Sequence, residues 1–140
     1  MIKAKELRMG NLVQVGDDEP IAIEVFNILD TGINQKLVYD EDFPEADPTI
    51  DLWLFEYIYP IPITAEWLLK AGFIEDDDWY GIKTDSGELF YYPAGQLLDF
   101  VDLNNSEVRL SESILHVHQL QNVYFSLSGK DLRISLEKVL

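Results

Sequence analysis

The tripeptide Asp-Thr/Ser-Gly occurs twice in the chain and is its nearest approach to a catalytic pattern. Asp30 leads the first copy, Asp30-Thr31-Gly32, and Asp85 leads the second, Asp85-Ser86-Gly87. Two aspartates held close together can share one proton, so that one acts as a base on water and the other as an acid. This pattern raises the hypothesis of an acidic hydrolase that uses Asp30 and Asp85 as a carboxylate pair.

Aspartic proteases carry their catalytic carboxylates in this tripeptide, but the similarity does not extend further. The hydrophobic-hydrophobic-Gly element of that family is not evident downstream, and Lys83-Thr84 precedes the second copy in place of two apolar residues. Asp and Gly are also the residues that tight turns select. The alternative, that both copies are hairpin turns, is therefore favoured.

Two further patterns could hold a metal ion, and both are incomplete. Asp76–Gly81 begins like a calcium loop, but Tyr80 stands at position 5 and Gly87 at position 12, where a bidentate Glu is needed. His116 and His118 would point in different directions on a helix. On an extended segment both could face one metal, but no third ligand is signalled. Glycine-rich nucleotide-binding motifs are also missing. We predict no metal and no cofactor, and favour a protein that is not an enzyme.

Composition excludes several classes of site. The chain has 140 residues and no cysteine, which rules out disulfides, thiolate nucleophiles and zinc–thiolate centres. The first residues, MIKAKELRMGNLV, lack the apolar core of a signal peptide. No stretch has the roughly 18 apolar residues of a membrane span. We expect a cytoplasmic protein that does not bind membranes.

The formal net charge of −16 favours a particular kind of partner. Residues 1–70 hold 5 basic and 14 acidic side chains and residues 71–140 hold 5 and 12, so both halves are acidic. A negative field repels phosphate backbones, which argues against direct nucleic-acid binding. It favours a protein partner that is basic or that itself binds DNA. Plain solubility is the alternative explanation.

The elements that would position these residues begin with a β-rich lobe. Strands are expected at 11–15, 21–29 and 33–39, joined by tight turns. Residues 40–51 are expected to form an acidic loop. The run LWLFEYIY at 52–59 is apolar on both faces and predicts a central strand. Its aromatic part, Trp53 to Tyr59, could also pair across a homodimer.

A second lobe follows the connector Pro60-Ile61-Pro62-Ile63. Thr64 and Gly72 bound a short helix at 65–71. Strands are expected at 79–83, 88–92, 96–103 (or a short helix there), 107–110 and 132–136. We predict an α+β fold with a small N-terminal antiparallel β sheet or barrel, residues 1–62. Residues 63–140 form a lobe with two helices and antiparallel strands, and the two lobes form one compact unit.

The clearest helical periodicity lies between His116 and Gly129. Apolar residues recur on one face at helical spacing, and Gly129 stands where a left-handed C-terminal cap is expected. The other face is rich in amides and poor in charge, which is unusual in so acidic a chain. We therefore predict His118, Gln119 and Asn122 as binding residues.

Three stretches resemble a family of small proteins common in gut-type anaerobic bacteria, their phages and integrated mobile elements. They are AKELRMGNLV, PIPITAEWLLKAGF at Pro60 to Phe73, and HVHQLQNVYFSLSGKDL at His116 to Leu132. The resemblance implies no activity and no catalytic residue. It implies an intracellular accessory protein encoded on mobile DNA, and it includes the amide-rich helix face.

The preferred hypothesis is a non-enzymatic, acidic protein-binding or adaptor protein of phage or mobile-element origin. A sharper alternative is a DNA mimic that inhibits a host DNA-binding protein, with carboxylates spaced along an elongated surface like phosphates. The acidic hydrolase with Asp30 and Asp85 is the alternative from another class.

Overall fold

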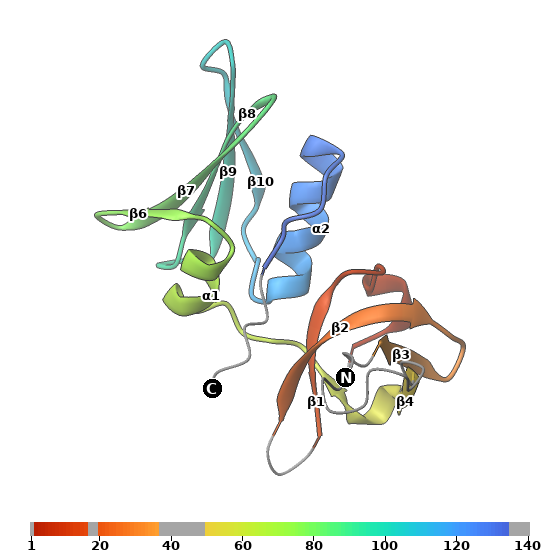
Figure 1. Ribbon diagram of the computed structural model, residues 1–140. Helices are drawn as coiled ribbons and strands as arrows, with labels where there is room; N and C mark the ends of the chain where they lie inside the picture. Colours follow the sequence, from red (N-terminus) through yellow and green to blue (C-terminus); the bar gives the residue numbers. More distant parts are fainter. Residues whose placement is uncertain (1, 17–19, 37–49, 135–140) are drawn as a thin grey trace, which may run out of the picture. The chain divides into compact units, whose positions relative to one another are not determined.

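The chain forms two compact units, each with its own hydrophobic core. The computed structural model describes residues 2–16, 20–36 and 50–134. The units are Met1–Ile61 and Pro62–Leu140, so the division falls inside the proline-containing connector. Two antiparallel sheets and two helices give an α+β structure (Figure 1). Each unit is described by itself below.

The first unit is a five-stranded antiparallel half-barrel. Its strands are β1 (Leu12–Val15), β2 (Ile21–Ile28), β3 (Gly32–Lys36), β4 (Ile50–Leu54) and β5 (Ile58–Tyr59), and a 3-10 turn (Ala4–Glu6) precedes them. The strand order is β4-β3-β2-β1-β5, so the first strand pairs with the last. Alternate residues, including Val13, Val15, Ile23, Val25 and Ile33, point into the core.

The prediction of a single strand at 52–59 is wrong. A 3-10 turn at Phe55–Tyr57 divides it into β4 and β5. β4 pairs with β3 at one edge of the half-barrel, whereas β5 pairs with β1 at the other edge. One straight strand cannot pair with both edges, so the run must change direction between them. Backbone bonds at both ends of the turn, Phe55 N to Thr31 O and Gly16 N to Tyr57 O, hold it in place.

The second unit is a meander of five antiparallel strands with two helices. Its elements are α1 (Ala65–Lys70), β6 (Ile74–Asp76), β7 (Trp79–Thr84), β8 (Gly87–Tyr92), β9 (Leu97–Asp102), β10 (Glu107–Ser111) and α2 (Val117–Ser128). Each strand pairs with its sequence neighbour. Residues of both helices, such as Leu68 and Leu120, pack with one face of the sheet, through Leu89, Tyr91 and Leu98.

Both expected helices are present, with their caps. Thr64 Oγ1 accepts the backbone N–H of Trp67 at the start of α1. Gly129 ends α2 in the left-handed conformation, with φ at 71°. The apolar positions of α2 lie in or against the core, as the periodicity predicts.

Two expectations for the remaining segments need correction. Residues 96–103 form a strand, β9, so the helix alternative is wrong. Leu132–Ile134 are not a strand, although Leu132 is buried in the core. Residues 135–136 of that expected strand, residues 37–39 of another and most of the acidic loop (40–49) lie outside the described residues. In the described part of the chain, no helix is long and apolar enough to cross a membrane.

Candidate functional site

The two Asp-Thr/Ser-Gly sequences are hairpin turns in different units. Asp30 lies between β2 and β3, where Leu29 N donates to Gly32 O at 2.8 Å. Asp85 lies between β7 and β8, where Thr84 pairs with Gly87. The Thr84 hydroxyl accepts from Ser86 N at 3.2 Å and donates to Gly87 O at 3.0 Å. The turn interpretation of both tripeptides is therefore confirmed.

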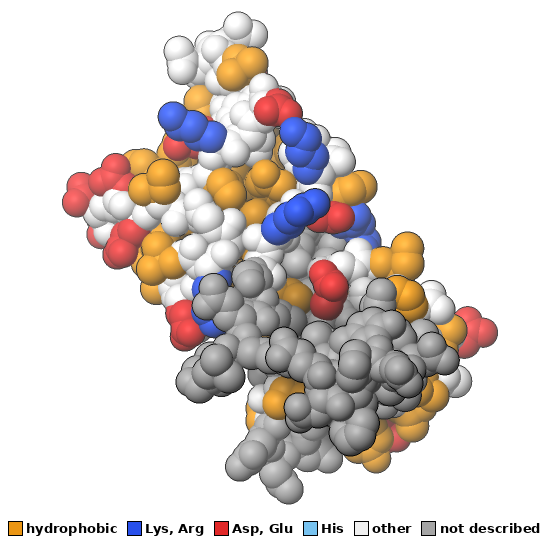
Figure 2. Space-filling view, viewed as in Figure 1, with side chains coloured by type: hydrophobic (Ala, Val, Ile, Leu, Met, Phe, Trp, Pro, Cys, Tyr) orange, Lys and Arg blue, Asp and Glu red, His pale blue; other side chains and the backbone are white. Residues whose placement is uncertain are grey.

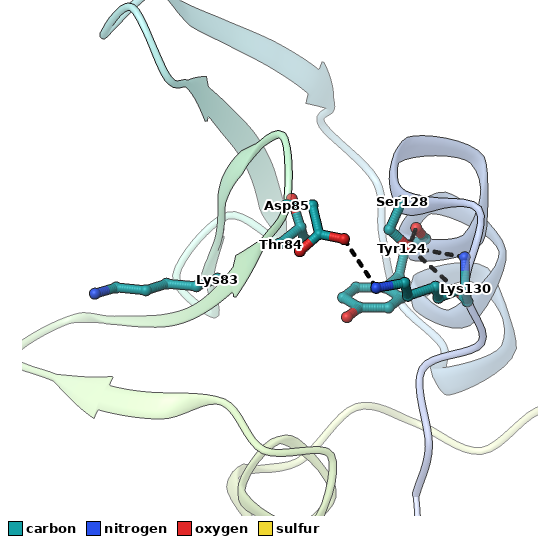
Figure 3. Close-up of a pocket in the computed structure, with 6 residues that line it drawn as sticks. All are labelled: Lys83, Thr84, Asp85, Tyr124, Ser128 and Lys130. Atoms are coloured by element: carbon teal, nitrogen blue, oxygen red, sulfur yellow. Dashed lines mark hydrogen bonds and ion pairs between the residues drawn. The ribbon is translucent and has the colours of Figure 1, made fainter.

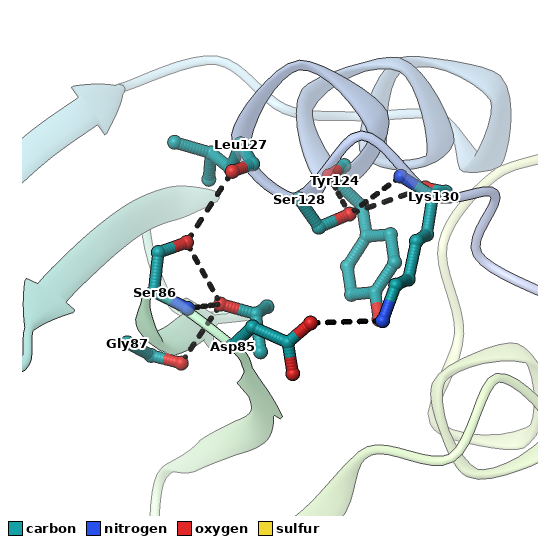
Figure 4. A network of polar contacts seen from close by, with 8 residues as sticks. Asp85, Ser86, Gly87, Tyr124, Leu127, Ser128 and Lys130 are labelled. Carbon is teal, nitrogen blue, oxygen red and sulfur yellow. Dashed lines mark hydrogen bonds and ion pairs between the residues drawn. The ribbon is translucent and has the colours of Figure 1, made fainter.

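The second of these turns contacts the C-terminal end of α2, which no sequence pattern indicated. Lys130 Nζ donates to Asp85 Oδ2 at 2.8 Å, and the Ser86 hydroxyl donates to Leu127 O at 3.3 Å (Figure 4). The hydrogen bond and the charge of Lys130 lower the pKa of Asp85. A carboxyl that donates a shared proton needs a raised pKa instead. This environment suits a structural ion pair better than acid catalysis.

An open pocket of about 200 Å³ lies beside this ion pair. Its lining comes from the β7–β8 hairpin and the end of α2: Lys83, Thr84, Asp85, Tyr124, Ser128 and Lys130. Figure 3 shows the Lys83 side chain extending away from the other five. Among these six residues the ammonium that faces the pocket, that of Lys130, is already paired with Asp85. The pocket thus offers hydroxyl groups and a neutralised ion pair, which suit hydrogen bonding to a polar group.

The predicted binding residues of α2 do not share one exposed face. His118 is only 2% exposed, and neighbouring Gln121 is also buried. The burial of His118 does not fit its predicted role as a binding residue on an exposed face. Asn122 is partly buried. The helical period correctly identified the apolar positions, but it could not show that the polar side also loses solvent.

Gln119 caps the N-terminus of α2, a structural role that was not predicted from the sequence. Its Oε1 accepts the backbone N–H groups of Leu115 and His116, both at 3.0 Å. The side chain at this third helical position reaches back over the start of the helix, as in a capping box. The amide of Gln119 therefore stabilises the N-terminus of α2.

We expect Gln119→Ala to lower the free energy of unfolding by about 1 kcal/mol, because two backbone donors lose their acceptor. Gln119→Glu is the matched control, since a carboxylate keeps the acceptor and suits a helix N-terminus. Urea denaturation followed by circular dichroism measures both. Equal losses in the two variants would show that the side-chain acceptor is not what stabilises the helix.

The two histidines lie closer together than their spacing suggested. His116 has an extended backbone at the N-cap, so its ring stacks on that of His118 at 5.9 Å with an interplanar angle of 11°. The prediction that the side chains point apart applied to a helix. Because His116 is extended, the alternative for an extended segment holds instead. Among the described residues, no group of three His, Asp or Glu side chains could hold a metal ion.

The second sheet also has a buried charge that the sequence did not reveal. Asp99 is 3% exposed, and its two carboxylate oxygens accept from Arg109 Nε at 2.9 Å and Nη2 at 3.3 Å. This bidentate pair raises the pKa of Arg109. The two residues are directly opposite in the β9–β10 register, which only the fold defines.

Charges of both signs are spread over the second unit. In the view of Figure 2, lysine and arginine side chains lie among acidic and hydrophobic ones on this unit. The mimic hypothesis requires carboxylates in phosphate-like rows, and the visible face of this unit offers no such row. A comparison of the chain with protein-family models, curated proteins and solved structures finds no match.

Proposed function

We propose that this chain is a non-enzymatic protein-binding or adaptor protein whose partner presents a basic segment. The observation that carries the proposal is the edge of the second sheet at β6, which pairs only with β7 in the described part of the chain. Ile74 is 73% exposed there and is followed directly by four acids, Glu75 to Asp78. A large exposed apolar side chain beside concentrated negative charge suits a partner that combines apolar and basic groups.

The rest of the surface supports the same kind of partner. Leu103 is 75% exposed and follows Asp102, and Val108 is 54% exposed between Glu107 and Arg109. With a net charge of −16, long-range attraction also accelerates the encounter with a basic protein. The absence of cysteine fits our proposal that binding takes place in the cytoplasm, for an accessory protein of phage or mobile-element origin.

Affinity capture from a lysate of the source cells tests this proposal. The tagged full chain is incubated at about 0.05 M and about 0.5 M salt, and retained proteins are identified by mass spectrometry. We expect a basic protein that is retained at low salt and depleted at high salt, because salt screens exposed charges. A blank at both concentrations, or an acidic partner indifferent to salt, would contradict the proposal.

A further inference from the structure

One face of the second sheet points away from the core of its unit and carries a row of residues that crosses all five strands. Directly opposite residues in adjacent strands point to the same side, whereas successive residues alternate. Residues one step along β7, β8 and β9 form the core. The row therefore lies on the opposite face, and its members are Ile74, Gly81, Phe90, Asp99 and Arg109.

Gly81 leaves room in this row for three neighbouring side chains. A Cβ atom at Gly81 would lie 3.0 Å from Trp79 Cζ3, 3.2 Å from Glu88 Oε1 and 3.3 Å from Phe90 Cδ1. The two rings meet edge to face, with centroids 4.9 Å apart and an interplanar angle of 82°. Two aromatic rings and a carboxylate thus converge above one glycine. We call this group of Trp79, Glu88 and Phe90 the Gly81 cradle.

The carboxylate of the cradle is turned toward the rings. Lys83 is the residue directly opposite Glu88, yet no ion pair joins them within the described residues. Glu88 also lines a pocket of about 330 Å³, and the side chains that share this lining include Lys83, Val101 and Asp102. A cation that enters beside this half-buried carboxylate can pair with the carboxylate and also contact the aromatic rings, and both interactions stabilise it.

The surroundings of the cradle favour a cationic ligand on an extended chain. β6 lies at the margin of the sheet (Figure 1), and in the described chain it pairs only with β7. Its three residues are all exposed. Figure 2 shows acidic and hydrophobic side chains together over β6 and the turn that follows it. An exposed sheet edge offers free backbone groups to an added extended segment.

We propose that the Gly81 cradle binds an arginine side chain of a basic, extended segment that lies along β6. Arginine fits because its planar guanidinium can stack on an aromatic ring while it pairs with a carboxylate. The same unit already places a cation over an indole, since Lys70 Nζ lies 5.1 Å from the Trp67 ring centroid. This inference rests on the proposed function, and it names the cradle and β6 as the surface that binds the partner.

The first test compares two labelled peptides on the full chain by fluorescence anisotropy. One is an Arg-Gly-Ser repeat, and the other has citrulline in place of each arginine, which keeps the shape and removes the charge. We expect the arginine peptide to bind at least about tenfold more tightly at low salt. Equal affinity, or no binding of the arginine peptide, would overturn the proposal.

Variants then separate the cradle from the general negative field. We expect Glu88→Gln and Trp79→Leu each to lower the affinity for the arginine peptide by about tenfold, because each removes one of the groups that form the cradle. Asp30→Asn removes the same charge as Glu88→Gln, but in the other unit and at a turn that tolerates asparagine. It is expected to change affinity by less than about twofold. Equal weakening by Asp30→Asn and Glu88→Gln would refute a local site.

Thermal unfolding of each variant checks that the second unit remains folded. If the Trp79→Leu variant does not fold, Phe90→Leu is used in its place to remove an aromatic ring of the cradle. Lysate capture with Glu88→Gln distinguishes this inference from the proposed function. If the basic partner is still captured, the adaptor proposal stands and the cradle is not its site. If the native chain captures no basic partner, the proposed function itself fails.

Discussion

Gly87→Ala is expected to lower the free energy of unfolding of the second unit by about 3 kcal/mol. Gly87 lies opposite Asp102, and a Cβ atom there would meet the carbonyl oxygen of Val101 directly. It would also lie 2.7 Å from Phe100 Cζ and 2.9 Å from Asp102 Cα. Two of these three obstacles are backbone atoms, which cannot move aside without disturbing the pairing of β8 with β9.

Gly129→Ala is the matched control for this prediction. Gly129 also has a positive φ, of 71°, but a Cβ atom there would meet nothing within 4 Å. We expect Gly129→Ala to lower the free energy of unfolding by only about 1 kcal/mol, the cost of an alanine in the left-handed conformation. Urea denaturation gives both free energies, and backbone NMR shows which unit is disturbed. Similar losses for the two variants would refute the close approach of strands at Gly87.

Leu120→Ala is expected to cost about 3 kcal/mol, because it leaves a cavity between α2 and the second sheet. Leu120 is 2% exposed and belongs to the core of that unit. Leu69→Ala on α1 removes the same atoms from a side chain that is 50% exposed, and we expect it to cost less than about 1 kcal/mol. Chemical denaturation measures the difference. Equal values would mean that α2 does not depend on this contact.

Both helices and the strands β7 to β10 of the second unit could be predicted because their signals are local, whereas β6 was missed and the strand expected from Leu132 is not formed at Leu132–Ile134. Each strand of the meander pairs with its sequence neighbour, and turn residues such as Asp85 and Gly87 stand between alternating runs. The caps of the helices at Thr64 and Gly129 are equally local. In the first unit, the division at Phe55 was missed because β-forming residues continue through it. Only the closure of the half-barrel requires that division.

The candidate sites could not be predicted, since they depend on register and on distant contacts. Asp85 pairs with Lys130, and no spacing rule connects a hairpin turn with the end of a later helix. The Gly81 cradle requires that Gly81 and Phe90 be directly opposite, and a shift of one residue would send these side chains to different faces. The sequence could show that the protein is acidic, but not where carboxylates and aromatic rings converge.

The pairing of β1 with β5 also has a consequence for how the chain folds during synthesis. The half-barrel closes only when Ile58 and Tyr59 reach Val15 and Gln14, whereas every strand pair in the second unit is consecutive. Closing a long loop before its contacts form slows folding. The first unit leaves the ribosome before the second, yet it cannot complete its sheet until β5 has been synthesised. In stopped-flow refolding we expect fluorescence from Trp53 to recover more slowly than that from Trp67 and Trp79, and the reverse order would contradict this consequence.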